Sequence, residues 1–195
     1  GDGEMRAVIL DGSRDGEDSL QEVQQILREE LTERAWEVEP FLLREMDIQR
    51  CVGDFACWVQ TPGICLIDDA ARDVARELVQ SDLAVLLTPV TFGGYSSELK
   101  KVLDRTIGLV SPHFMRINGE VHHEPRYARI PRLMAVGLLP SADEESEGIF
   151  KTLVSRNALN MHAPAHVAGV VLNNEGQKGM REKIRALLAV VGEQE

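Results

Sequence analysis

All three cysteines of this 195-residue chain, Cys51, Cys57 and Cys65, lie in one short segment that is followed by Asp68 and Asp69. Thiolates and carboxylates are ligands for transition metals, and neighbouring thiols can also be oxidised to a disulfide. Thiols that only fill a core would be spread along the chain. The clustering therefore indicates a site, or the remnant of one, at residues 51–67.

A second group of reactive residue types occupies the loop of residues 11–19, between an apolar run and a predicted helix. Ser13 and Ser19 offer hydroxyl groups, and Arg14 offers a positive charge. Together with the free N–H groups at a helix start, they predict an anion site. The loop is neither a Walker A motif nor G-x-G-x-x-G, which argues against a nucleoside triphosphate or a dinucleotide. The alternative is an ordinary helix start with Asp18 or Ser19 as N-cap.

The loop of residues 88–96 carries paired glycines, Gly93 and Gly94, flanked by the aromatic residues Phe92 and Tyr95. Glycines let the backbone come close to a planar ligand, and the rings offer a surface for it. The alternative is a tight turn followed by a helix that Ser96 caps.

The elements that must position these loops form an alternating series. Four nearly continuous apolar runs, at residues 7–10, 83–87, 133–139 and 167–172, are typical of strands buried on both faces of a parallel sheet. Residues 36–43 alternate instead, and Pro40 favours an edge strand. Helical spacing between these runs is carried by Leu20, Val23, Leu27 and Leu31, by Val74 and Leu78, by Leu99, Val102 and Leu103, by Ile149 and Leu153, and by Met180, Ile184 and Leu187.

This alternation predicts an α/β fold with a doubly wound, five-stranded parallel sheet and helices on both faces. Ligands bind such sheets beyond the carboxyl ends of the strands, where the loops of residues 11–19 and 88–96 lie. With 44% apolar residues, the chain is expected to form a single domain over residues 1–195.

The composition argues against two classes of partner, nucleic acids and membranes. A net charge of −11 opposes nucleic-acid binding, and no apolar run approaches the roughly 18 residues needed to cross a membrane. An odd number of clustered cysteines favours a reducing compartment, so a cytoplasmic location is expected.

Taken together and in order, these motifs resemble the NADPH-dependent FMN reductase branch of the flavodoxin-like superfamily, and especially its iron–sulfur flavoprotein relatives. The resemblance covers about residues 6–172. It is carried by Gly12-Ser13-Arg14, by the cysteine segment through Trp58, Thr61-Pro62-Gly63, Cys65 and Asp68-Asp69, and by Thr88-Pro89-Val90, Phe92-Gly93, Tyr95-Ser96, Leu99-Lys100 and Asp104-Arg105.

The resemblance implies a flavodoxin-like sheet with strand order 2-1-3-4-5 and FMN at its carboxyl edge. It implies that Ser13, Arg14, Asp18, Ser19 and Leu20 surround the phosphate, partly through their backbone, and that Pro89, Val90, Thr91, Phe92, Gly93 and Tyr95 surround the isoalloxazine. NAD(P)H would be the co-substrate, and a small molecule or a protein the electron acceptor. The relatives and the apolar loops near the site imply a homodimer or homotetramer.

The sequence departs from these relatives in the cysteine segment. Cluster-bearing relatives have four cysteines, whereas Asp54 stands at the second position here. A carboxylate is a harder ligand than thiolate, so an iron–sulfur cluster is not expected. A structural loop around Trp58 and Pro62 is favoured. Zinc on the three cysteines and Asp54 is a weaker alternative, and a redox-active pair of Cys57 and Cys65 is another.

A second departure concerns the phosphate loop, where relatives commonly have amides in place of Asp11 and Asp18. These carboxylates would repel a phosphate unless they turn away. Three hypotheses therefore stay open: an NAD(P)H-dependent FMN oxidoreductase, which is favoured, a flavodoxin-like electron carrier, and a non-enzymatic module with a decayed flavin site.

Residues 111–131 are expected to form a long irregular insertion. His122 and His123 are adjacent and cannot easily point at one metal ion, so no metal is expected there. His123, Arg126 and Tyr127 are expected to stabilise the insertion, line the flavin pocket or contact a partner subunit.

Overall fold

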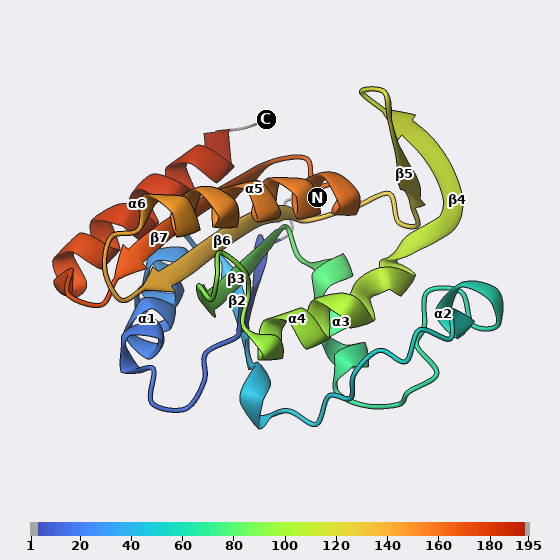
Figure 1. The fold of residues 1–195 in the computed structure, drawn as a ribbon, viewed down its shortest axis with the longest axis horizontal. Coiled ribbons are helices and arrows are strands. Elements are labelled where there is room, and N and C mark those ends of the chain that lie inside the picture. The colour runs from blue at the N-terminus through green and yellow to red at the C-terminus, as the bar shows by residue number, and fades with distance from the viewer. Residues whose placement is uncertain (1–3, 194–195) are drawn as a thin grey trace.

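Residues 4–193 are described by the computed structural model of the protein, drawn in Figure 1. The predicted single domain of residues 1–195 also includes residues 1–3 and 194–195, which lie outside the described part. Strands and helices alternate along the chain. In order, the elements are β1 (Arg6–Asp11), α1 (Asp18–Glu33), β2 (Glu37–Leu42), the 3-10 helix η1 (Leu43–Glu45), α2 (Ala56–Val59), α3 (Ala71–Gln80), β3 (Leu83–Pro89), α4 (Ser97–Arg105), the 3-10 helix η2 (Thr106–Leu109), β4 (Val110–Ile117), β5 (Glu120–Pro125), β6 (Arg132–Leu139), α5 (Glu144–Met161), β7 (His166–Leu172) and α6 (Gly176–Glu193).

Five parallel strands form the central sheet, in the order β2-β1-β3-β6-β7. The apolar runs became β1, β3 and β6, which are buried along nearly their whole length, and β7. The strand with Pro40 lies at one edge, as predicted. The numbering differs from the predicted 2-1-3-4-5 because two further strands, β4 and β5, come between β3 and β6 along the chain. They form a separate hairpin outside the central sheet.

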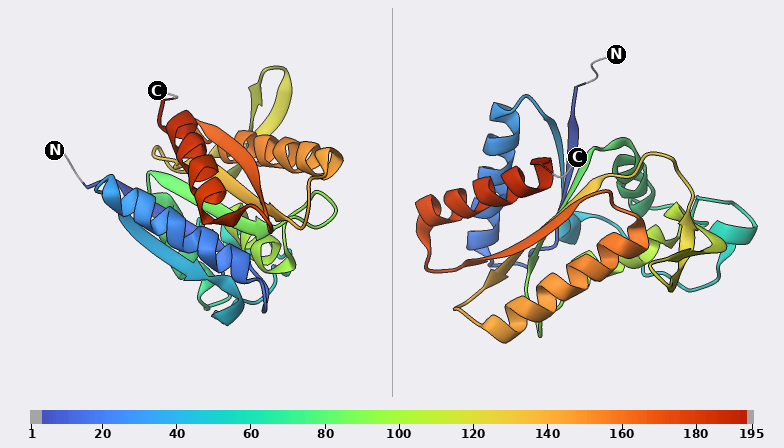
Figure 2. Two further views of the ribbon diagram at one scale, coloured as in Figure 1. Left: turned by 90° about the vertical axis from the view of Figure 1, so that its left-hand side faces the viewer. Right: turned by 90° about the horizontal axis from the view of Figure 1, so that it is seen from above.

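Helices cover both faces of the sheet. The apolar sides of α1 and α6 share one core cluster, and α3, α4 and α5 share the other. Figure 2 shows α1 and α6 together on their side of the sheet. No helix within residues 4–193 has the length and apolar character needed to cross a bilayer.

The predicted helix around Ile149 and Leu153 is present as α5, but its buried face is different. Phe150, Val154 and Ala158 enter the core, whereas Ile149 is 48% exposed. Both faces satisfy helical spacing, so spacing alone could not choose between them. The choice follows from the sheet below, where Gly137 leaves room for the ring of Phe150.

The prediction that residues 111–131 are irregular is wrong for most of the segment. Residues 110–125 form the antiparallel hairpin of β4 and β5. Its turn is Asn118-Gly119, and both residues have positive φ, 51° and 86°. Such a pair suits the tight primed turns of hairpins, and Asn-Gly was the sequence signal for it. The coil after the hairpin is held by Arg126, whose Nε donates to the Gly108 carbonyl at 2.8 Å.

Glu30 is a buried carboxylate that links α1 to α6. Its side chain is 1% exposed and pairs with Arg34, Arg181 and Arg185. The hydrogen bonds from Arg185 outweigh burial and, with those from Arg34 and Arg181, lower the pKa of Glu30 from 4.5 to about 2. Because folding lowers this pKa, ionised Glu30 stabilises the protein above pH 4.5, and that stabilisation is lost as the pH falls towards 2.

The substitution Glu30→Gln is therefore expected to lower the free energy of unfolding by about 2 kcal/mol at neutral pH, a value reduced for the partial exposure of the three arginines. The deficit relative to wild type should shrink as the pH falls below 4.5. Urea denaturation at several pH values measures both effects. Glu33→Gln, at an exposed position of the same helix, is the matched control. A deficit that stays constant down to acidic pH would contradict this role of Glu30.

Candidate functional site

The two predicted loops meet at the carboxyl edge of the sheet. Asp11 ends β1 beside Leu87 of β3, and the Gly12 N–H donates to the Leu87 carbonyl at 2.7 Å. The Ser96 hydroxyl donates to the Gly12 carbonyl at 2.6 Å and accepts from the Leu99 N–H, which confirms Ser96 as the cap of α4. A Cβ at Gly12 would lie 2.7 Å from that of Leu99, so glycine is required for this close approach of the loops.

Ser13 lies at the centre of the first loop. It is fully buried, and its hydroxyl accepts a 2.7 Å hydrogen bond from Arg44 Nη1. Arg44 belongs to η1 and also pairs through Nε with Asp15, at 3.1 Å. Arg44 was not among the residues predicted from the sequence. The available signal was its position directly after β2, the strand beside β1, since parallel strands end at a shared edge.

Arg14, the cation that was predicted, is exposed and turned towards Glu17. Its Nη2 lies 3.0 Å from one Glu17 carboxylate oxygen, and its backbone N–H donates to the other at 2.7 Å. Glu17 is the N-cap residue of α1, without a side-chain cap, so the alternative of Asp18 or Ser19 as N-cap is wrong. Both lie in the first helical turn instead. The two arginines of this edge are thus paired with carboxylates of the loop itself, Arg14 with Glu17 and Arg44 with Asp15.

The remaining residue predicted for the phosphate site is Leu20, in the first turn of α1. Its side chain is fully buried in the core below α1. Its N–H donates to the Glu17 carbonyl at 3.0 Å, so the chain is tightly wound at the helix start.

Asp11 is a buried carboxyl group beside the loop. It is 1% exposed, and Oδ1 accepts from the Ser13 N–H at 2.8 Å, whereas Oδ2 has no partner among residues 4–193. Burial raises the pKa of Asp11, against the opposing effects of the Ser13 hydrogen bonds and the charge of Arg44. A raised pKa means that the protonated acid stabilises the fold at low pH and that this gain is lost as the pH rises through the raised pKa.

Accordingly, Asp11→Asn is expected to raise the free energy of unfolding by about 1 kcal/mol at neutral pH, because the amide removes a buried charge and keeps an oxygen for the Ser13 N–H. The advantage over wild type should disappear at acidic pH, where Asp11 is protonated. Thermal denaturation between acidic and neutral pH measures the difference. A variant less stable than wild type at neutral pH would show that the ionised group is needed.

The second loop forms a tight turn. Thr91 and Gly94 exchange two backbone hydrogen bonds, of 3.0 and 2.8 Å. At the tip, Phe92 and Gly93 both have positive φ, and the ring of Phe92 is 97% exposed. Behind the turn, the Val90 N–H donates to the Leu138 carbonyl at 2.9 Å. The turn therefore presents an aromatic side chain and the end of β3 at the same edge as the first loop.

Tyr95 points away from that edge. Its hydroxyl accepts from the Asn157 amide of α5 at 2.8 Å, and its ring meets Phe150 edge to face. Burial raises the pKa of Tyr95 to about 12, so the hydroxyl stays neutral. The structure thus joins the two loops at one edge of the sheet, through Gly12, Leu87 and Ser96, and directs Tyr95 towards α5.

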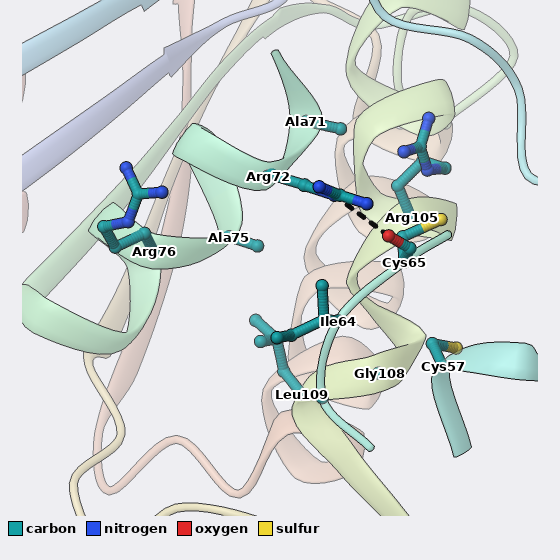
Figure 3. Close-up of a pocket in the computed structure, with 11 residues that line it drawn as sticks. Cys57, Ile64, Cys65, Ala71, Arg72, Ala75, Arg76, Arg105, Gly108 and Leu109 are labelled. Atoms are coloured by element: carbon teal, nitrogen blue, oxygen red, sulfur yellow. Dashed lines mark hydrogen bonds between the residues drawn. The ribbon is translucent and has the colours of Figure 1, made fainter. Parts of the chain in front are cut away.

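The cysteine segment lies away from this edge, against α3, the end of α4 and η2. Figure 3 shows Cys57 and Cys65 at the wall of a cavity of about 310 Å³, where Arg72 Nε donates to the Cys65 carbonyl at 3.0 Å. Trp58 Nε1 donates to the Ile107 and Val110 carbonyls, which fixes the segment to η2 and to the start of β4.

The donor set of this segment does not match a four-iron cluster. Burial, followed by the neighbouring thiols, raises the pKa of Cys57 and so disfavours its thiolate. The Asp54 carboxylate accepts from the Ala56 N–H at 3.0 Å, a local turn bond. Within residues 4–193, no three His, Cys, Asp or Glu side chains are arranged to hold a metal ion.

Part of this chain is similar in sequence to a curated flavoprotein. An iron–sulfur flavoprotein of Methanocaldococcus jannaschii is 30% identical over 76 residues, which are 39% of this chain and 38% of that protein. The chain thus matches less than half the length of this curated relative.

Solved structures share the fold over nearly the whole chain. An NAD(P)H:quinone oxidoreductase from Methanothermobacter marburgensis matches with a TM-score of 0.68 at 15% identity, over 94% of this chain and 97% of that one. An FMN-dependent NADH-azoreductase from Bacillus anthracis, in complex with FMN, matches with a TM-score of 0.60 at 13% identity, over 95% and 98%. At such identities the likeness establishes the flavodoxin-like fold.

The family follows from the sequence itself. Residues 5–118 match the model of the family described as NADPH-dependent FMN reductase. This stretch contains both loops of the carboxyl edge and the cysteine segment, and it confirms the predicted resemblance. The chain belongs to the NADPH-dependent FMN reductase family.

Proposed function

We propose that the protein is an FMN-dependent oxidoreductase that uses NAD(P)H as the reductant. The observation that carries the proposal is the group of anion donors at the carboxyl edge, Ser13, Arg44 and the start of α1, in a chain of this family. When bound, FMN would supply the redox chemistry by taking up a hydride and passing electrons on. The chain's own residues bind it, orient it and set the charge around it.

The phosphate is proposed to lie at the first loop. The groups proposed to bind it are Ser13 Oγ, the guanidiniums of Arg44 and Arg14, Ser19 and the backbone from Asp15 to Leu20. Asp18 lies in the same helical turn. A fully buried hydroxyl already bonded to a guanidinium supports this placement, because both groups can donate to phosphate oxygens. The helix dipole adds to the attraction.

The acidic side chains of the first loop lower its affinity for the FMN phosphate. Glu17 and Asp15 hold the two arginines, and they must release them when phosphate binds. Both carboxylates have access to solvent, so they can turn outwards, whereas Asp11 is buried and cannot. The donor chemistry therefore fits an FMN phosphate, at a cost in affinity from Asp11.

The isoalloxazine is proposed to contact Pro89, Val90, Thr91, Phe92 and Gly93. The positive φ of Phe92 and Gly93 and the full exposure of the Phe92 ring support this role, since an exposed aromatic residue at such a turn offers a face to a planar ring. Tyr95 is proposed to support the loop through Asn157 and not to contact the flavin.

We further propose that residues 1–195 act as one FMN-binding domain in the cytoplasm, as a homodimer or homotetramer. The electron acceptor is proposed to be a small molecule or a protein.

A titration of FMN into the purified protein, followed by flavin fluorescence and then by turnover with NADPH or NADH and a quinone, tests the proposal. Saturable binding with turnover is expected. Saturable FMN binding without turnover by either nucleotide would favour the electron-carrier hypothesis over the oxidoreductase hypothesis. Failure to bind FMN at all would favour the non-enzymatic module.

A further inference from the structure

The cavity of about 310 Å³ beside the cysteine segment, called the thiol cavity below, brings a thiol together with positive charges (Figure 3). It is lined by residues of α3, by residues 63–65, by the end of α4 and by η2. Its volume lies at the lower end of the range for small-molecule sites. Within residues 4–193, the charged side chains that line it are all arginines: Arg72, Arg76 and Arg105. The lining therefore favours a negatively charged occupant, although the chain as a whole has a net charge of −11.

Cys65 is the thiol of the segment that is placed to react at this cavity. It is half-buried, whereas Cys57 is buried and the exposed Cys51 does not line the cavity. Figure 3 shows the Cys65 thiol pointing towards Arg105. Cys57, Cys65 and Arg105 also line a neighbouring cavity of about 30 Å³, which has room for about one water molecule. A larger group attached to Cys65 therefore has to enter the thiol cavity.

Arg105 has a buried N–H group that no oxygen completes. Its Nη1 and Nη2 bond to Asp69 and to backbone carbonyls, whereas Nε has no partner among residues 4–193. Burial acts to lower the pKa of Arg105, but the hydrogen bonds and charges of Asp69 and of a Cys65 thiolate outweigh burial and raise this pKa. The buried guanidinium is thus a partner for the thiolate of Cys65, which is the nucleophilic form of the group.

Arg72 supplies a second guanidinium beside Cys65. Its Nε donates to the Cys65 carbonyl at 3.0 Å, and its Nη1 pairs with Asp68 at 2.8 Å. Asp68 is 83% exposed and does not line the cavity. Because Nη1 and Nη2 each carry a second N–H group, Arg72 can also donate to a carboxylate inside the cavity. The guanidinium of Arg76, by contrast, points away from Cys65 (Figure 3).

We propose that Cys65 is a site of thiol–disulfide exchange that takes the disulfide of a small, carboxylate-bearing thiol. The Cys65 thiolate attacks one sulfur of this disulfide, and the S–S bond of the disulfide breaks. One half becomes joined to Cys65 through a new S–S bond, with its carboxylate at Arg72, and the other half leaves as a thiolate. Cys65 is oxidised and the departing half is reduced, so the exchange needs no other oxidant. The proposal goes beyond the flavin chemistry and does not depend on FMN binding at the carboxyl edge.

Disulfide exchange with reagents of similar size and different charge tests this proposal. The reagents are 3,3′-dithiodipropionate, which carries carboxylates, the uncharged 2-hydroxyethyl disulfide, and cystamine, which carries ammonium groups. The protein is the reduced full chain with Cys51→Ser, so that the exposed thiol does not contribute. Intact mass measures the rate of adduct formation, and peptide mapping assigns the adduct. Each rate is divided by the rate of the same reagent with 2-mercaptoethanol, which removes differences in intrinsic reactivity.

We expect an adduct at Cys65, with a normalised rate at low ionic strength that is roughly 2- to 30-fold higher for the dicarboxylate than for cystamine. Arg72→Met should lower this ratio by roughly 2- to 5-fold, whereas Arg72→Lys, which keeps the charge, should retain most of it. Arg76→Met removes a guanidinium that points away from Cys65 and should leave the ratio unchanged. Because Arg72 also holds the segment, the rate with the uncharged disulfide shows whether a variant changes the exposure of Cys65.

An adduct on Cys57, or no adduct at all, would overturn the proposal. It is also overturned if the dicarboxylate reacts no faster than cystamine after normalisation, or if Arg72→Met leaves the ratio unchanged.

Discussion

Replacing Arg105 by methionine is expected to lower the free energy of unfolding by about 3–5 kcal/mol. Arg105 of α4 and Asp69 form a two-pronged ion pair, with Nη1 and Nη2 at 2.8 and 2.9 Å from the two carboxylate oxygens. Their side chains are 1% and 2% exposed. Without Arg105, Asp69 would be a buried charge without a counterion.

The pair also holds the cysteine segment in place. Arg105 donates to the Gln49 and Ile67 carbonyls, and Asp69 accepts from the Gln49 and Ala71 N–H groups. Burial acts to raise the pKa of Asp69. The hydrogen bonds from Arg105 and from the Gln49 and Ala71 N–H groups outweigh burial and lower this pKa. The network thus ties both ends of the segment to α4, so its loss should also expose the thiol of Cys57, which is buried in the wild type.

Urea denaturation measures the change in stability, and the rate of thiol labelling reports on the segment. Arg76→Met is the matched control, because Arg76 forms a surface ion pair with Asp73 within α3. Both side chains of this pair are about 60% exposed. A surface pair of this kind contributes at most about 1 kcal/mol. Equal stability of the two variants would contradict the structural role of the buried pair.

Replacing Arg44 by methionine is expected to weaken FMN binding by about 10- to 150-fold, the loss of one charged hydrogen bond. Arg44 is held between Ser13 and Asp15, so its guanidinium is already positioned for the phosphate. Arg14 is exposed and engaged with Glu17, so Arg14→Met should have the smaller effect.

A titration of FMN at fixed ionic strength compares the two variants with wild type. Arg28→Met removes the same charge from an exposed position of α1 and controls for the overall charge of the protein. If Arg44→Met binds FMN like Arg28→Met, the phosphate does not lie at Ser13 and Arg44.

Much of the fold could be read from the sequence because burial on both faces leaves a clear mark. The runs of β1, β3 and β6 are apolar at nearly every position, and Pro40 indicated the edge strand. The buried face of α5 could not be read, since Ile149 and Phe150 both begin a helical stripe and the choice depends on Gly137 in another strand. The hairpin was missed although Asn118-Gly119 indicated it.

The site was predictable as two loops, but not as a set of contacts. Ser96 was predicted as a helix cap only in the alternative interpretation of the second loop, and its bond to Gly12, far away in sequence, arises only from strand order. Arg44 was missed because no motif marks it, and its role depends on β2 lying beside β1. Pairing of Arg14 with Glu17 depends on the way the loop folds, which residue types alone do not determine.

Anaerobic mixing of the FMN-loaded protein with NADPH, and separately with NADH, shows whether a nicotinamide nucleotide reduces the bound flavin. We predict that the visible absorption band of the bound flavin bleaches with at least one nucleotide and returns when a quinone is added. A protein that binds FMN stoichiometrically, yet keeps its flavin oxidised in the presence of both nucleotides, would contradict it.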